Sequence, residues 1–200
     1  CTPPAERCNG ADDDCDGRLD EETFGVAGPA RALPWIGNWV DAMAATVTDE
    51  GFAFAYCLSD DRWEAPAQPV VVVWTDERGS ILGEPIRLDD PESPSCGQID
   101  MVSAGDEVAV VWAQGHYWEP LTRFVAFANR EAVRVRTTIE GAIGESYPRL
   151  AWTGDSLAVV QGRQMALVAP DGTVVGDEIA LPEEIDWVPR NRPAIAWDDA

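Results

Sequence analysis

The chain has 200 residues, which is room for one full-sized domain or for a domain with an appendage, and this length excludes a multi-enzyme chain. It carries 36 acidic residues against 14 basic ones, so its formal net charge at pH 7 is −22. Because such a surface repels phosphate, we expect neither nucleic acid nor anionic membrane as a partner. No apolar run approaches the roughly 18 residues that a membrane-spanning helix needs, so we expect no transmembrane segment.

Three Asp residues near the start of the chain form a pattern suited to a hard cation. Asp12, Asp14 and Asp16 alternate along the sequence and are followed by Gly17. These residue types match positions 1, 3, 5 and 6 of a calcium loop, in which several oxygens converge on the ion. Position 7 would offer the main-chain carbonyl of Arg18. We therefore expect Ca²⁺ as the ligand.

The loop differs from an EF-hand at its end. An EF-hand has a bidentate Glu at position 12, where this chain has Thr23, so a later acidic residue has to close the site. The alternative interpretation is a solvated acidic linker, since runs of like charge are usually unstructured. The predicted metal ligands are Asp12, Asp14, Asp16, Arg18 (carbonyl), Asp20 and Glu21.

Five cysteines, an odd number, are spread over the chain. Cys1, Cys8 and Cys15 fall at seven-residue steps in the acidic, loop-rich stretch, which favours disulfides and export from the cell. An economical pairing joins Cys8 to Cys15 and Cys57 to Cys96, and leaves Cys1 over. A first-residue Cys is where a bacterial lipoprotein carries its lipid, and a small loop closed by Cys1 and Cys8 is an equal alternative. We expect an extracellular or cell-surface protein.

Residues 6–21 read ERCNGADDDCDGRLDE and resemble a bacterial family. They fit every fixed position of the E-x-C-N-G-x-D-D-D-C-D-G-x-x-D-E pattern of the MopE-type metal-binding motif, which occurs in secreted and surface proteins. The resemblance covers under a tenth of the chain and implies metal binding outside the cell. Copper is the weaker expectation, because it prefers imidazole and sulfur and the one histidine, His116, is far from the loop.

From about residue 40 onward the sequence repeats itself. Residues 102–111 (VSAGDEVAVV) and 151–160 (AWTGDSLAVV) share five of ten positions at an offset of 49, and residues 46–55 are a weaker first copy. A second signature at 79–88 (GSILGEPIRL) recurs at 172–181 (GTVVGDEIAL), an offset of 93. The offsets indicate a repeating unit of 45 to 50 residues.

Each unit contains short β-rich runs separated by Gly, Asp or Pro turns, which predicts an all-β fold. In the third unit we expect strands near 149–152, 157–161, 164–169 and 174–181. Four strands in about 45 residues is the size of a propeller blade, whereas a β-sandwich explains the strands but not the repeat. The units resemble the blades of bacterial extracellular propeller-like proteins, without the WD40 or sialidase Asp-box signatures.

These patterns predict three parts: an acidic metal-binding motif at 1–22, a linker at 23–38, and β-propeller-like repeats at 39–200. Pro193–Trp197 repeats Pro148–Trp152, so we expect three blades and the first strand of a fourth. Known propellers have about four to eight blades, which predicts that this chain is a piece of a longer protein.

Aromatic residues in two predicted loops are candidates for ligand binding. Trp63 and Trp118 are each followed by Glu at matching places in two units. His116 and Tyr117 directly precede Trp118. Their rings would form a platform for a carbohydrate or protein ligand, or would pack over the following strand. Trp152 lies in a predicted first strand, where we expect it to pack in the core.

Catalytic motifs are scarce in the chain. There is one His, no G-x-S-x-G motif and no phosphate-binding loop, so we predict that the protein is not an enzyme. The prediction is a secreted or surface-anchored calcium-binding protein with a propeller-like binding or scaffold domain. The alternative is a glycosidase-like propeller hydrolase with an accessory acidic segment, for which two carboxylates should converge in a central pocket.

Overall fold

The computed structural model describes residues 39–59, 69–89, 98–114, 122–139 and 148–181. By its contacts the chain divides into two units, Cys1–Arg31 and Ala32–Ala200, and every described residue belongs to the second. The regular elements in these ranges are all β-strands. Accordingly, the described residues contain no helix of the length and apolarity needed to cross a membrane.

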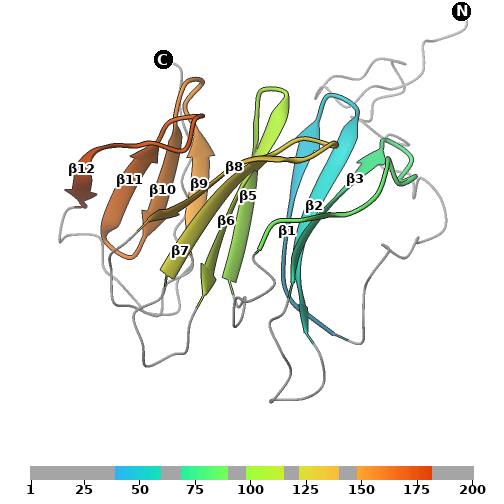
Figure 1. The fold of residues 1–200 in the computed structure, drawn as a ribbon, viewed down its shortest axis with the longest axis horizontal. Helices are drawn as coiled ribbons and strands as arrows, with labels where there is room; N and C mark the ends of the chain where they lie inside the picture. Colours follow the sequence, from blue (N-terminus) through green and yellow to red (C-terminus); the bar gives the residue numbers. More distant parts are fainter. Residues whose placement is uncertain (1–38, 60–68, 90–97, 115–121, 140–147, 182–200) are drawn as a thin grey trace, which may run out of the picture. The chain divides into compact units, whose positions relative to one another are not determined.

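The strands form three antiparallel four-stranded sheets, in each of which spatial order follows chain order (Figure 1). The first sheet consists of β1 (Trp39–Thr48), β2 (Gly51–Ser59), β3 (Val70–Asp76) and β4 (Ile86–Arg87). The second consists of β5 (Gln98–Ala104), β6 (Glu107–Gln114), β7 (Thr122–Ala128) and β8 (Val133–Ile139). The third consists of β9 (Arg149–Trp152), β10 (Leu157–Gln161), β11 (Gln164–Val168) and β12 (Val174–Ala180). The predicted all-β class and the four strands of the third unit are confirmed.

Side-chain patterns explain which strands are central. The second and third strands of the first sheet are rich in small and β-branched residues, and β3 has six consecutive buried residues, Val70–Thr75. A continuous buried run of this kind is typical of a strand that is covered on both faces. In β8, by contrast, Val and Arg alternate and exposure alternates with them, as expected for an edge strand with one solvated face.

The repeat in the sequence is also a repeat in the backbone. Gly105 and Gly154 occupy the same place in two copies, and both have positive φ, 69° and 95°, in the turn that joins the first two strands of a sheet. Glycine adopts this conformation without the steric cost that a Cβ would add. The shared Gly thus fixes the same hairpin in both sheets.

The second signature behaves in the same way at its offset of 93 residues. The turn after β3 is closed by a hydrogen bond from the Gly79 N–H to the Asp76 carbonyl, and the turn after β11 by one from the Gly172 N–H to the Ala169 carbonyl. Two further backbone hydrogen bonds recur at the same offset. The Asp76 N–H donates to the Ser80 carbonyl, and the equivalent Ala169 N–H donates to the Thr173 carbonyl. Likewise the Leu88 N–H donates to the Val70 carbonyl, and the Leu181 N–H donates to the Arg163 carbonyl.

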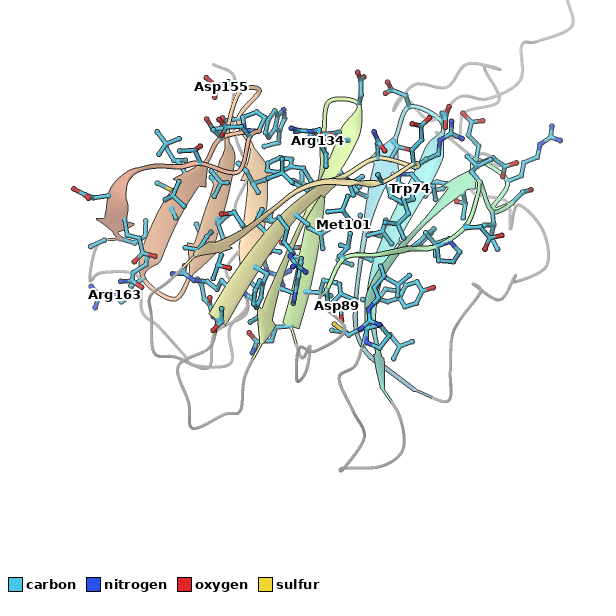
Figure 2. The ribbon with its side chains drawn as sticks, viewed as in Figure 1. Trp74, Asp89, Met101, Arg134, Asp155 and Arg163 are labelled. Carbon is cyan, nitrogen blue, oxygen red and sulfur yellow. The ribbon has the colours of Figure 1, made fainter. Side chains whose placement is uncertain are left out.

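Two apolar cores join the three sheets. The first strands are in contact in chain order, β1 with β5 and β5 with β9. The first core lies between the first and second sheets and includes Val72, Trp74, Met101, Val108 and Val110, with Trp74 and Met101 labelled in Figure 2. The second core lies between the second and third sheets and includes Val111, Phe127, Leu157, Val159 and Val168. The second sheet is therefore covered by apolar side chains on both faces.

A buried ion pair also links the second and third sheets. The Arg123 side chain on β7 is fully buried, and its Nη2 donates to Glu178 Oε1 on β12 at 2.5 Å. Burying a guanidinium is costly unless a counter-charge accompanies it. Glu178 supplies that charge from the last strand of the neighbouring sheet.

Candidate functional site

A hollow of about 570 Å³ lies at the ends of the first two sheets, where their hairpin turns meet. A volume of this size lies within the range of small-molecule sites, about 300–1,000 Å³. Its lining residues come from the turns after β1, β3, β5 and β7: Thr48, Asp49, Glu50, Trp74, Leu82, Gly83, Gly105, Asp106, Glu107, Val108, Asn129, Arg130 and Glu131.

The hollow combines an apolar floor with an acidic rim. Trp74, Leu82 and Val108 provide the apolar surface, and all three belong to or pack against the first core. The rim carries five carboxylates and one guanidinium. Such an excess of like charge produces a negative potential that favours cationic groups over anionic ones.

Two ion pairs fix part of the rim. Arg130 reaches from the second sheet to Glu50 on the first, with 3.0 Å between Nη1 and Oε2. Glu107 accepts two hydrogen bonds from the Arg134 side chain, which is labelled in Figure 2 and also donates to the Pro170 carbonyl. The hydrogen bonds to Glu107 and the negative charges of Glu107 and Asp171 raise the pKa of Arg134, so this guanidinium stays charged at all relevant pH values.

The turn after β7 is held by a side chain of its own. Asn129 Oδ1 accepts hydrogen bonds from the backbone N–H groups of Glu131, at 2.9 Å, and Ala132, at 3.0 Å. Asn commonly stabilises turns by bonding to the backbone two residues on. Arg130 and Glu131 are thereby placed at the rim.

The described residues that line the hollow supply carboxylates, one guanidinium, an amide and the Thr48 hydroxyl as polar groups, and they include no His, Cys or Ser. In the described ranges, no group of three or more His, Cys, Asp or Glu side chains is arranged to hold a metal ion.

A second polar cluster connects β5 to β9. Asp100 Oδ2 accepts a hydrogen bond from the Leu150 N–H at 3.0 Å, and Asp100 Oδ1 lies 3.4 Å from Arg149 Nη1. Burial raises the pKa of Asp100, and the Leu150 hydrogen bond and the Arg149 charge offset only part of that rise. The cluster joins two sheets and has a structural role.

Most residues singled out from the sequence lie outside the described ranges. They are Cys1, Cys8, Asp12, Asp14, Cys15, Asp16, Arg18, Asp20, Glu21, Trp63, Cys96, His116, Tyr117, Trp118 and Trp197. The metal loop and the aromatic platform therefore stay predictions.

Two of the predicted residues are described. Cys57 lies on β2, is fully buried and is disulfide-bonded. It is the one cysteine within the described ranges, so the pairing with Cys96 stays a prediction. Trp152 is partly buried against the second core, and its ring meets that of Phe127 edge to face at 6.3 Å between centroids, which confirms the predicted packing role.

The hollow was not predicted from the sequence, although a signal for it exists. Asp49 and Asp106 both follow the first strand of a repeat unit, in turns that the repeat itself identifies. A carboxylate recurring at one turn of successive units indicates an acidic edge. What the sequence alone does not contain is the packing that brings these turns around Trp74.

No protein-family model matches the chain, and no curated protein matches it significantly. A function can therefore be argued only from the residues and their arrangement.

Proposed function

We propose that this chain is an exported bacterial protein that binds Ca²⁺ through its acidic loop and carries a β-propeller-like repeat domain as a binding or scaffold module. The observation that carries the proposal is the alternation of Asp12, Asp14 and Asp16 before Gly17, inside a stretch that meets every fixed position of the MopE-type motif. A Ca²⁺ ion takes six to eight oxygen ligands, and this loop supplies them at the right spacing.

Charge explains what the ion would do. Residues 1–22 hold eight carboxylates against only two Arg, and the carboxylates repel one another in the absence of a cation. Binding of Ca²⁺ offsets that repulsion, so binding and ordering of the loop are coupled. A disulfide between Cys8 and Cys15 would hold the short loop in place of the helices that flank an EF-hand. The ion has a structural role in this proposal.

Three features of the described sheets support a propeller-like arrangement of the repeats. The strands of each sheet follow one another in space as they do in the chain. Each sheet is packed face to face on the next through an apolar core. The first strands of successive sheets are in contact, as are the innermost strands of neighbouring propeller blades.

The test is Ca²⁺ binding by the 200-residue chain, measured by calorimetry and by terbium luminescence. The double variant Asp14→Asn/Asp16→Asn removes two ligands, and we expect it to weaken binding at least a hundredfold. The matched control, Asp49→Asn/Asp106→Asn, removes the same charge from the rim of the hollow and should leave the affinity unchanged.

Two results would contradict the proposal. One is unchanged Ca²⁺ affinity in the Asp14→Asn/Asp16→Asn variant. The other is loss of affinity in the control variant alone, which would place the ion in the hollow. Competition by Cu²⁺ at equal concentration addresses the metal: an oxygen-rich loop without imidazole should retain Ca²⁺.

A further inference from the structure

The Arg134 guanidinium, labelled in Figure 2, fills a defined place between the second and third sheets. Its central carbon lies 5.7 Å from the centroid of the Phe127 ring. Its N–H groups donate to both carboxylate oxygens of Glu107 and, at 2.7 Å, to the Pro170 carbonyl on the third sheet. An aromatic face with carboxylate and carbonyl acceptors beside it suits a guanidinium well. We call this place the filled site.

The first sheet has a counterpart of the Phe127 ring. Phe127 pairs with Ala109 across β6 and β7, and its side chain belongs to the second core. Trp74 pairs with Ala53 across β2 and β3, and its side chain belongs to the first core. The two Ala residues hold the same position of the repeat. Trp74 is therefore placed toward the second sheet as Phe127 is placed toward the third.

The turn after β7 is the counterpart of the turn after β11. In each turn the N–H of the first residue donates to the carbonyl of the last. Counted from the start of the turn, Arg130 holds the position of Pro170, and Glu131 holds that of Asp171. Trp74, Arg130 and Glu131 all line the hollow between the first and second sheets. The hollow is thus the counterpart of the filled site, one sheet earlier in the chain.

The first sheet has no residue equivalent to Arg134. Arg134 is an extra residue of β8, at the point where the register between β7 and β8 shifts. In the first sheet, Ile81 lies opposite Thr75, and the next residue, Leu82, donates its N–H to the Trp74 carbonyl. No extra residue separates these two contacts. The guanidinium that fills the later site is therefore missing from the hollow.

A second group of the filled site is also replaced. The Trp152 ring on β9 meets the Phe127 ring edge to face, with 6.3 Å between centroids. At the offset of 49 residues, Trp152 corresponds to Ser103 on β5. A hydroxymethyl group in place of an indole leaves space between the sheets. The two replacements account for a hollow at this place.

The charges of the hollow still call for a cation. Arg130 is bound to Glu50, and because their side chains are 45% and 54% exposed, this pair lies at the rim. Asp49, Asp106 and Glu131 have no ion-pair partner among the residues that the structure describes. Within the same residues, no guanidinium lies over the aromatic ring of the hollow.

We propose that the hollow binds the guanidinium of an arginine side chain that a partner protein supplies. The Trp74 ring offers the aromatic face, and the three carboxylates without a partner offer the counter-charge. A planar guanidinium suits such a place better than an ammonium, because it stacks on a ring while its N–H groups donate in the plane. Free arginine suits it less, because its α-carboxylate would meet the negative rim. The proposal rests on the described sheets and is independent of the calcium loop.

The test is calorimetric titration of the 200-residue chain with Nα-acetylarginine amide as the probe. We expect saturable binding. Nα-acetylcitrulline amide has the same shape without the charge and should not bind. Nα-acetyllysine amide has the charge without the planar fork and should bind about tenfold more weakly than the probe. Free L-arginine should also bind more weakly than the probe.

Two double variants show where the probe binds. Asp106→Asn/Glu131→Gln removes two exposed carboxylates of the hollow and should weaken binding about tenfold. The matched control, Asp155→Asn/Asp177→Asn, removes two exposed carboxylates from the third sheet and should leave the affinity unchanged. Asp155 holds the position of Asp106 in the next unit. In a further variant, Ser103→Trp restores the indole of the filled site and should abolish binding, with circular dichroism as the measure of folding.

Any of four results would overturn the proposal. They are no saturable binding of the probe at millimolar concentration, equal affinity for the arginine and lysine probes, equal effects of the two double variants, and L-arginine binding at least as tight as that of the probe. Terbium binding is measured on the same samples. Because the acidic loop is untouched in every variant, its Tb³⁺ affinity tests the calcium proposal separately.

Discussion

The backbone N–H of Leu150 donates a 3.0 Å hydrogen bond to Asp100 Oδ2, so a carboxylate of the second sheet caps the first strand of the third. Arg149, the neighbouring residue, adds its charge at 3.4 Å from the other carboxylate oxygen. Asp100 and Arg149 are 49 residues apart and hold the same position of the repeat. Equivalent positions thus carry opposite charges where β5 and β9, the first strands of the second and third sheets, meet.

The pH dependence of this link follows from the raised pKa of Asp100. Burial raises it, so the folded protein binds the Asp100 proton more tightly than the unfolded chain does. That stabilising contribution is complete below the unfolded pKa of about 3.9 and is lost as pH rises through the higher folded pKa. We predict that the free energy of unfolding of the wild type, minus that of Asp100→Asn, falls as pH rises above about 4. Urea unfolding of both proteins between pH 3 and pH 7 measures this difference, and a gap that is constant or grows with pH would contradict the assignment.

The two equivalent glycines Gly79 and Gly172 differ in their surroundings. Both have positive φ, 75° and 86°, but a Cβ on Gly172 would lie 2.4 Å from Val135 Cγ1, whereas a Cβ on Gly79 would meet nothing within 4 Å. Gly79→Ala should therefore cost only the backbone strain, about 1–2 kcal/mol. Gly172→Ala should cost about 1–3 kcal/mol more, because it also crowds the second sheet.

Chemical denaturation of the two Gly variants gives both values. In a Val135→Ala background the extra cost of Gly172→Ala should largely disappear, since the crowded methyl group is gone. Equal destabilisation by Gly79→Ala and Gly172→Ala would show that the turn after β11 does not press on β8.

The disulfide of Cys57 can be assigned by a double-mutant cycle. If Cys57 is bonded to Cys96, then Cys57→Ala, Cys96→Ala and the double variant should each lose the same stability, about 2–4 kcal/mol, because each removes the same cross-link. Cys8→Ala serves as the control with an unchanged repeat domain. Losses that add up in the double variant would mean that Cys57 has another partner.

The strands of the third sheet could be predicted to within one residue at their ends, and the reason is local. Turn residues such as Gly154 and Gly172 mark the hairpins, and the apolar runs between them, such as Leu157–Gln161, have strand length. The sequence units repeat the same pattern of strands and turns, so a strand that is weakly indicated in one unit is supported by the equivalent residues of the next. Local turn chemistry and repetition together were sufficient for these elements.

The hollow and the polar links between sheets depend on packing that a single strand does not encode. Asp49 and Asp106 look like ordinary solvated turn charges until two sheets bring them to one rim. Arg123 would be expected at the surface, and its burial follows from Glu178, which lies 55 residues away on another sheet. Contacts of this range require the relative placement of whole sheets.

The agreement between chain order and strand order has a consequence for how such a domain can grow. Every backbone hydrogen-bond ladder described here closes within one sheet, between strands adjacent in the chain. Tandem duplication of the DNA that encodes one unit would therefore add a complete sheet without breaking a ladder in the existing ones. Only the apolar faces have to match, and the recurrence of Val72, Trp74, Leu82 and Ile86 as apolar residues 93 positions later shows that this requirement is kept across units. Selection can thus alter the number of sheets in whole steps.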